Sequence, residues 1–394
     1  MTVEAGFGQD RAEKMMRERV QARWQDAYAP VKHLDPILVL TALGLSAIGL
    51  VMIYSAKLAA LNQQGLPTTW YVSRQLMALV IGIVVLVGAA VIDYRHLRSY
   101  AVVLYAASLG FLVLVLTGLG TARGGSQRWI VLGGFQLQPS EIAKVAVLIT
   151  VAAWIHERKG EPWLPTVAVS LVLTLIPMGL VFLQPDLGTS LVFIWMLAVL
   201  FLVGRVPTRY LAGLGVAGIA AAVFAITQDL LDQYQLNRLT AFARAGDPSL
   251  DRNLRFQTEQ SEIAIGSGQV FGKGLFQGTQ TSLAFVPENH TDFIFTVVGE
   301  EFGFFGASIV LALFLVLIWR GLRIAMLSKD LFGTLLASGV VAMLALQVFI
   351  NVGMNVGIMP VTGLPLPFIS YGGTSLIVWF GLVGLLLNVH MRRF

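Results

Sequence analysis

The strongest constraint on this chain is a series of apolar runs long enough to cross a lipid bilayer. A helix needs about 20 predominantly apolar residues to span the hydrocarbon core. Ten runs approach or exceed this length, at residues 37–55, 72–92, 101–119, 141–155, 164–183, 187–203, 210–226, 292–318, 332–352 and 372–389. With 56% hydrophobic and 12% charged residues, the chain also has too little polar surface for a water-soluble fold. The sequence therefore predicts an all-α polytopic membrane protein with ten transmembrane helices.

The basic residues predict the orientation of the chain in the membrane. Ten spans place both termini on one side, so the connecting segments fall into two alternating sets. The set that contains the termini carries seventeen Lys and Arg residues, whereas the short loops of the other set carry Lys57, Arg74, Arg123 and Arg128. Cytoplasmic loops of membrane proteins are enriched in Lys and Arg. Both termini are therefore expected in the cytoplasm, and the net charge of +5 reflects topology and not nucleic-acid binding.

Two segments lie outside the spans of the 37–390 transmembrane domain. Residues 1–36 form a basic cytoplasmic segment, which is either a short helix on the anionic membrane surface or a disordered tail. Residues 227–291 form one long extracytoplasmic loop between the seventh and eighth helices. Loops beyond about 15 residues in a compact domain are usually functional or disordered. Because this loop is rich in apolar residues, we expect it to fold back onto the mouth of the bundle and to serve the function.

Ionisable residues within the spans need a partner or a function, because a charge at the bilayer centre costs at least about 2.5–3.5 kcal/mol. Glu141 and Lys144 are three residues apart on one helix and can form a structural ion pair. Asp186 separates the fifth and sixth runs, where it is either a turn and helix-cap residue or a site residue. The absence of cysteine excludes disulfides, thiol nucleophiles and cysteine-ligated zinc.

The densest polar cluster, PENHTDFIFTVVGEEFG at 287–303, leads into the eighth run. Asp292 opens this helix, and Glu300 and Glu301 follow about two turns deeper. Asp292 is either a partner of the helix dipole or a partly desolvated carboxylate at a cleft mouth, which suits a general base. His290 is the one histidine expected on the outer side, so a multi-histidine metal site is not expected.

Two segments rich in glycine suggest unusual backbone. The glycine-rich loop, GSGQVFGKG at 266–274, is similar to a phosphate loop but has the wrong spacing for a Walker motif. Its tight backbone could present Lys273 to a lipid diphosphate. LPLPFISYGGTS at 364–375 predicts an irregular, rigid segment before the last helix. Non-helical backbone at membrane depth is tolerated where it lines a cavity.

Five motifs resemble those of the SEDS family of bacterial cell-wall proteins, which comprises RodA, FtsW and SpoVE. They are GGSQRWI (124–130), QPSEIAKVA (138–146), QPDLGTS (184–190), PENHTDFIFTVVGEEFG (287–303) and LPFISYGGTS (366–375). The resemblance covers about residues 35–390 in motif order, spacing and number of spans. The segments GGFQLQPSEIAK and PLPFISYGGTS are more similar to RodA, the elongation member, than to FtsW. The 1–36 segment is longer than the tails expected of RodA, which leaves its role open.

This resemblance implies a peptidoglycan glycosyltransferase that polymerises lipid II into glycan strands for cell elongation and rod shape. It implies a location in the bacterial cytoplasmic membrane, an active site that faces outward, and a class B penicillin-binding transpeptidase as partner. The essential carboxylate of the family falls on Asp292. The resemblance also points to Arg74, Trp129, Asp186 and the Glu141–Lys144 pair.

Polymerisation of a lipid-linked sugar requires a base for the acceptor hydroxyl and positive charge for the departing diphosphate. We hypothesise that Asp292 deprotonates the GlcNAc 4-hydroxyl of lipid II. The expected diphosphate ligands are Arg74, Lys273 and either Arg128 or a divalent cation, Mg or Mn. The long loop is expected to cover the sugars, while the lipid tails stay among the membrane lipids. The remaining candidates are Trp129, Asp186 and His290 for substrate contact, and Glu141, Lys144, Glu300 and Glu301 as structural residues of the cavity.

Other classes of function stay open on the sequence. Ten helices with embedded charges also describe a lipid II flippase or another transporter, although carriers place substrate near the membrane midplane between repeated halves. A non-catalytic scaffold for a transpeptidase would make the apolar outer helices important and Asp292 dispensable. An FtsW-like division protein is the alternative within the family.

Overall fold

The computed structural model describes residues 33–117, 120–123, 126–132, 135–228, 252–283 and 285–393. The predictions for residues 1–32 and 229–251 lie outside the described residues. Within the described ranges, nine helices are long and apolar enough to cross a membrane: α2 (Pro36–Gln63), α3 (Trp70–Val91), α4 (Tyr94–Leu116), α5 (Pro139–Glu157), α6 (Trp163–Phe182), α8 (Thr208–Thr227), α12 (Ile294–Met326), α13 (Leu331–Asn355) and α14 (Gly373–Met391). A further apolar helix, α7 (Leu187–Val203), has 17 residues. The predicted helical membrane fold is confirmed, and each of the ten apolar runs forms a helix.

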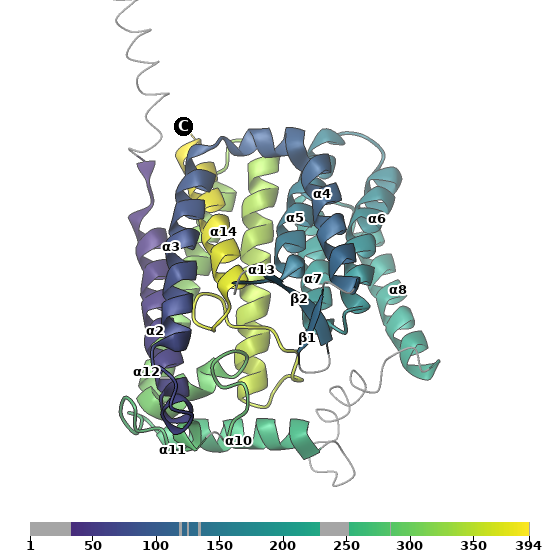
Figure 1. Ribbon diagram of the computed structural model, residues 1–394. Coiled ribbons are helices and arrows are strands. Elements are labelled where there is room, and N and C mark those ends of the chain that lie inside the picture. The colour runs from purple at the N-terminus through teal and green to yellow at the C-terminus, as the bar shows by residue number, and fades with distance from the viewer. Residues whose placement is uncertain are drawn as a thin grey trace, which may run out of the picture.

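The helices lie alongside one another in a bundle with α13 near its centre (Figure 1). Helices α5, α13 and α14 are largely buried, whereas α3 and α4 expose broad apolar faces that suit contact with lipid. The start of α2 and the end of α14 lie at the upper end of the bundle in Figure 1. At the lower end, α10 (Arg252–Gly268) and α11 (Thr279–Ser282), which fall within the predicted long loop, lie across the bundle (Figure 1).

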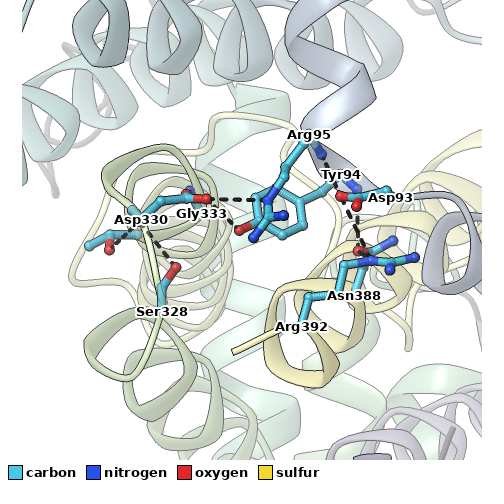
Figure 2. Close-up of polar contacts among 9 residues, drawn as sticks. Asp93, Tyr94, Arg95, Ser328, Asp330, Gly333, Asn388 and Arg392 are labelled. Carbon is cyan, nitrogen blue, oxygen red and sulfur yellow. Dashed lines mark hydrogen bonds and ion pairs between the residues drawn. The ribbon is translucent and has the colours of Figure 1, made fainter. Parts of the chain in front are cut away.

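A polar network at the upper end of the bundle joins three helices (Figure 2). Asp330 caps α13 by accepting a hydrogen bond from Gly333 N over 2.7 Å, and it also accepts from the Tyr94 hydroxyl of α4 over 2.8 Å. Asn388 of α14 accepts from Tyr94 N over 3.3 Å and from Arg392 Nε over 2.8 Å. These contacts set the relative positions of α4, α13 and α14 at this end.

A small antiparallel sheet between α4 and α5 is the departure from the all-α prediction. The strands pair in the order β1 (Thr121–Arg123), β2 (Ser126–Leu132) and β3 (Phe135–Leu137). Trp129 lies opposite Thr121, and Ile130 lies opposite Leu137. Aromatic and β-branched residues in β2 favour a strand over an irregular loop. Because side chains alternate along a strand, Arg128 and Trp129 point to opposite faces of the sheet.

Helix α12 is broken at Gly303, whose φ of 64° and ψ of −161° are not helical. Such a break leaves the carbonyls that precede it without helical partners. The glycine-rich loop supplies the missing donors. Lys273 N donates to Glu300 O over 3.0 Å, and Gly274 N donates to Glu301 O over 3.1 Å. The first part of α12 therefore ends against the main chain of this loop.

The amides that follow the break are paired with the same loop. Phe304 N donates to Gln269 O over 2.8 Å. Phe305 N donates to Val270 O over 3.0 Å. A side chain at Gly272 does not fit, because a Cβ atom there would lie 2.1 Å from Glu301 O. The segment that is similar to a phosphate loop thus caps both sides of a broken helix.

We expect Gly303→Ala to lower the thermal stability of the detergent-solubilised protein. An alanine would have to keep a positive φ, and its Cβ atom would lie 2.4 Å from Gly272 N. A loss of about 1–3 kcal/mol in the free energy of unfolding is expected from this strain. Gly110 in α4 is the matched control, because nothing lies within 4 Å of its Cβ position. Thermal unfolding followed by circular dichroism compares the two variants, and equal effects would contradict a special role for the break.

Candidate active site

Asp292 lies in the turn that leads into α12, and its side chain is partly exposed. Two amides of α13 hold its main chain. Asn351 Nδ2 donates to Asp292 O over 2.8 Å, and Asn355 Nδ2 donates to the same oxygen over 3.2 Å. Both asparagines are fully buried. Because satisfied buried polar networks rigidify a structure, the main chain of Asp292 has a fixed position beneath an accessible carboxylate.

The same network joins Asp292 to the long loop. Asn355 Oδ1 accepts from Thr296 N over 3.2 Å and from Thr296 Oγ1 over 2.6 Å. Ser261 of α10 donates to Asn355 O over 2.7 Å, and its hydroxyl lies 2.5 Å from that of Thr296. No sequence motif described above includes Ser261 or Asn355. The available signal is NVGMN at 351–355, since asparagines in an apolar run need hydrogen-bond partners.

On its other side, the Asp292 turn is held by the irregular segment before α14. Ser370 Oγ donates to Thr291 O over 2.6 Å, and Tyr371 N donates to His290 O over 2.9 Å. The Ser370 hydroxyl also accepts from Leu366 N over 2.8 Å. The motifs HTD and SYGG, which lie far apart in the sequence, are therefore bonded to each other by one side-chain and one main-chain donor of SYGG.

Aromatic rings pack around His290, which is buried. Tyr71 of α3 contacts His290 edge to face, with ring centroids 4.9 Å apart. Tyr371 stacks on His290 with centroids 5.6 Å apart, and the two tyrosine rings are themselves 5.1 Å apart. These contacts place the start of α3 beside the turn that carries Asp292.

Two cations border this aromatic cluster. Lys57 Nζ of α2 lies 5.9 Å from the centre of the Tyr71 ring. The Arg74 guanidinium lies 3.6 Å from the centre of the Trp70 ring, which in turn contacts Tyr71 at 4.7 Å. A cation–π contact holds a cation without neutralising its charge. Lys57 and Arg74 are therefore placed to attract an anionic ligand. The sequence indicates a contribution of Lys57 to membrane topology alone.

Glu300 and Lys273 form an ion pair next to the break in α12. Lys273 Nζ lies 2.8 Å from Glu300 Oε1. The start of α11 adds three donors, since Gln280 N, Thr281 N and Thr281 Oγ1 donate to the Glu300 carboxylate over 2.8, 2.9 and 2.7 Å. Charge-assisted hydrogen bonds of this kind are strong. The structure thus pairs the Lys273 ammonium with Glu300, whereas the sequence predicts Lys273 as a diphosphate ligand.

Arg128 and Asp186 form a second pair, at the turn before α7. Arg128 Nη1 lies 3.7 Å from Asp186 Oδ1, and the guanidinium also donates to Gln184 O over 3.1 Å and to Pro185 O. Asp186 caps α7 by accepting from Thr189 N over 3.1 Å. The cap interpretation of Asp186 agrees with these contacts. Since the guanidinium already docks the sheet on this turn, substrate contact by Arg128 stays a prediction.

The predicted pair of Glu141 and Lys144 forms a third cluster, with Lys144 Nζ 2.7 Å from Glu141 Oε1 and both residues buried. Burial of this polar start lets α5 begin earlier than the apolar run, at Pro139. Glu301 is also buried and accepts a hydrogen bond from the Ser55 hydroxyl of α2. These groups have protein partners, as a structural role requires.

The candidates predicted from the sequence thus fall into separate clusters. Asp292, His290 and Arg74 belong to one mouth of the bundle, whereas Trp129 lies partly exposed on the sheet. Among the residues that the structure describes, no group of three or more His, Cys, Asp or Glu side chains could hold a metal ion. A divalent cation bound jointly with substrate stays a prediction.

The fold and this site define a polytopic membrane protein with a partly exposed carboxylate on a fixed main-chain turn at one mouth of its bundle. The family model for FtsW, RodA and SpoVE, described as cell cycle proteins, matches residues 36–393. The chain belongs to this family, as the motifs predict.

Named relatives agree with the family assignment. The chain is 40% identical to the peptidoglycan glycosyltransferase MrdB of Escherichia coli K12, over 92% of this chain and 94% of the relative. It is 38% identical to a probable peptidoglycan glycosyltransferase FtsW of Geobacter metallireducens, over 92% and 96%. It is 37% identical to the stage V sporulation protein E of Bacillus subtilis, over 90% and 96%. These matches support a glycosyltransferase role in cell-wall synthesis.

Solved structures share the fold. A chain from a peptidoglycan synthase complex, studied for its coordination of polymerization and crosslinking, superposes with a TM-score of 0.76 at 32% identity. The rod shape determining protein RodA of Thermus thermophilus superposes with a TM-score of 0.68 at 32% identity. Each comparison covers 92% of this chain and 98% of the other.

The Glu300 cluster predicts an asymmetry between two substitutions. Glu300→Ala leaves three donors of α11 without their acceptor, each at a cost of about 1–3 kcal/mol, so a loss of about 3–5 kcal/mol in unfolding free energy is expected. Lys273→Met leaves Glu300 with its remaining donors, so a smaller loss of about 1 kcal/mol is expected. Thermal unfolding of the two variants measures the difference. Equal losses would show that the ion pair, and not the full set of donors, stabilises the loop.

Proposed function

We propose that this chain polymerises lipid II into glycan strands for cell elongation, with Asp292 as the general base. The observation that carries the proposal is the Asp292 turn, whose main chain is held from two sides by buried or nearly buried polar groups. A base must sit within hydrogen-bond reach of the proton that it removes. A fixed main chain and a partly exposed carboxylate meet that need.

The reaction needs one proton transfer from the acceptor and one leaving group. The 4-oxygen of the acceptor GlcNAc attacks the anomeric carbon of the growing chain, and its proton passes to the Asp292 carboxylate. The bond between that carbon and the polyprenyl diphosphate breaks with inversion. Because a diphosphate leaves as a stabilised anion, it requires positive charge and not a proton.

Arg74 and Lys57 are the cations that we assign to the diphosphates. Both border the aromatic cluster around His290, and a cation–π contact leaves the charge of a cation available to an anion. Lys273 and Arg128, which the sequence also suggests, are bound to Glu300 and Asp186. We therefore leave them out of the proposed binding site.

We further propose that this site faces the outer surface of the bacterial cytoplasmic membrane and that the protein works with a class B penicillin-binding transpeptidase. The excess of Lys and Arg at the end of the bundle that holds the start of α2 supports a cytoplasmic location for that end. The site lies at the opposite end. The similar chain from a complex that coordinates polymerization with crosslinking supports a cross-linking partner.

A flippase and a scaffold are the competing functions. The partly exposed carboxylate on a held main-chain turn at one mouth favours chemistry there over a carrier site near the midplane of repeated halves. A scaffold does not require Asp292. Substitution of this residue therefore separates the enzyme from the scaffold.

Asp292→Asn is expected to lower the rate of lipid II polymerisation by about 100- to 10,000-fold, because the amide cannot accept the proton. The measurement is glycan strand formation from labelled lipid II by the purified protein with its transpeptidase partner. Glu262→Gln is the matched control, since it removes an exposed carboxylate of α10 at the same end of the bundle. Partner binding is measured separately. Polymerisation by Asp292→Asn at the wild-type rate would exclude Asp292 as the base.

Arg74→Gln is expected to raise the KM for lipid II about tenfold, because a charge-assisted contact with diphosphate contributes about 1.5–3 kcal/mol. Arg209→Gln is the control, since Arg209 stacks on Tyr210 at 5.1 Å at the other end of the bundle. Initial rates over a range of lipid II concentrations give KM for each variant. Equal effects of the two substitutions would argue against Arg74 as a diphosphate ligand.

A further inference from the structure

We infer that Gln75 of α3 is a positioning residue for Asp292, which it controls through the segment at 370–372. The inference rests on the proposed function, because it assigns a role in the reaction to a side chain that does not touch the reacting groups. Gln75 is 2% exposed and directly follows Arg74 in the chain.

The Gln75 amide binds main chain with both of its polar atoms. Its Nε2 donates to Ser370 O over 3.1 Å, and its Oε1 accepts from Gly372 N over 3.1 Å. An amide is the side-chain group that offers a donor and an acceptor side by side at this length. Among the main-chain hydrogen bonds of the described turns and loops, none uses Ser370 O or Gly372 N, so Gln75 pairs two groups that regular structure would otherwise pair.

The segment that Gln75 holds is bonded to the two residues before Asp292. Ser370 Oγ donates to Thr291 O over 2.6 Å, and Tyr371 N donates to His290 O over 2.9 Å. The chain of contacts from Gln75 to the Asp292 turn therefore consists of four hydrogen bonds between near neighbours. A displacement of the 370–372 segment moves the two donors, Ser370 Oγ and Tyr371 N, that hold this turn.

Close packing holds the residues just before this segment. Gly49 of α2 faces residues 368–369 so closely that a Cβ atom at Gly49 would lie 2.6 Å from Ile369 O. The 370–372 segment is thus bonded to α3, and the residues that precede it pack against α2. Because Arg74 and Gln75 are consecutive residues of α3, one helix sets both the cation assigned to the leaving group and the position of the base.

Gln75→Met tests this role, because methionine keeps the length of the side chain and removes both hydrogen bonds. Gln347→Met is the matched control. Gln347 of α13 is fully buried, and neither polar atom of its amide has a hydrogen-bond partner within the described structure. Both substitutions remove a buried glutamine amide, but only the first removes contacts with the segment beside Asp292.

The expected result is a loss of about 10- to 100-fold in kcat for Gln75→Met, because a small misplacement of a catalytic group has effects of that size. The KM for lipid II should stay within twofold of the wild-type value, and Gln347→Met should leave both parameters within twofold. Ser370→Ala interrupts the same chain of contacts. If these four hydrogen bonds act as a unit, the double variant Gln75→Met/Ser370→Ala loses no more kcat than the more affected single variant.

Three results would overturn the inference: an unchanged kcat in Gln75→Met, an equal loss in Gln347→Met, or full additivity of the Gln75 and Ser370 effects. Full additivity of the two effects on kcat would overturn the inference even if Gln75→Met also lowers Tm. Asp292→Asn is measured in the same assay. If that variant remains active, the proposed function fails, whereas an inactive Asp292→Asn beside a fully active Gln75→Met refutes this inference alone.

Discussion

A membrane protein must satisfy its main-chain polar groups internally, because the bilayer core provides no water to pair with them. Two irregular stretches of this chain show how that demand is met. The break in α12 at Gly303 is capped by the glycine-rich loop, and the 370–372 segment is held by the Gln75 amide. The break at Gly303 ends the first part of α12, which begins just after Asp292. The 370–372 segment bonds to the two residues before Asp292. The position of the proposed base follows from how the surrounding backbone is paired.

The chemistry depends on this rigidity. A general base and a set of cations are effective when they are already in place before the substrate arrives. Asn351 and Asn355 fix the Asp292 turn from α13, and aromatic rings hold Lys57 and Arg74 while leaving their charge intact. The long loop is part of the same construction, since Ser261 of α10 bonds to Asn355 and Thr296. Loop, base and cations therefore belong to one connected structure.

The sequence predicts what depends on local spacing. Apolar runs give the helices, and the three-residue spacing of Glu141 and Lys144 gives their ion pair. Contacts between distant residues escape such analysis: Gln75 and Ser370 are 295 positions apart, so no local pattern connects them.

The glycine-rich loop shows a second limit, since the same flexible backbone suits a phosphate loop and the cap of a broken helix. Lys273 is consequently assigned to diphosphate on the sequence, although its ammonium binds Glu300. Whether Asp292 acts as a base is tested most directly by chemical rescue of Asp292→Ala with formate during lipid II polymerisation. If Asp292 is the base, Asp292→Ala is inactive and its rate rises and saturates with formate, while the wild-type rate does not change. Polymerisation by Asp292→Ala at the wild-type rate without formate would exclude Asp292 as the base.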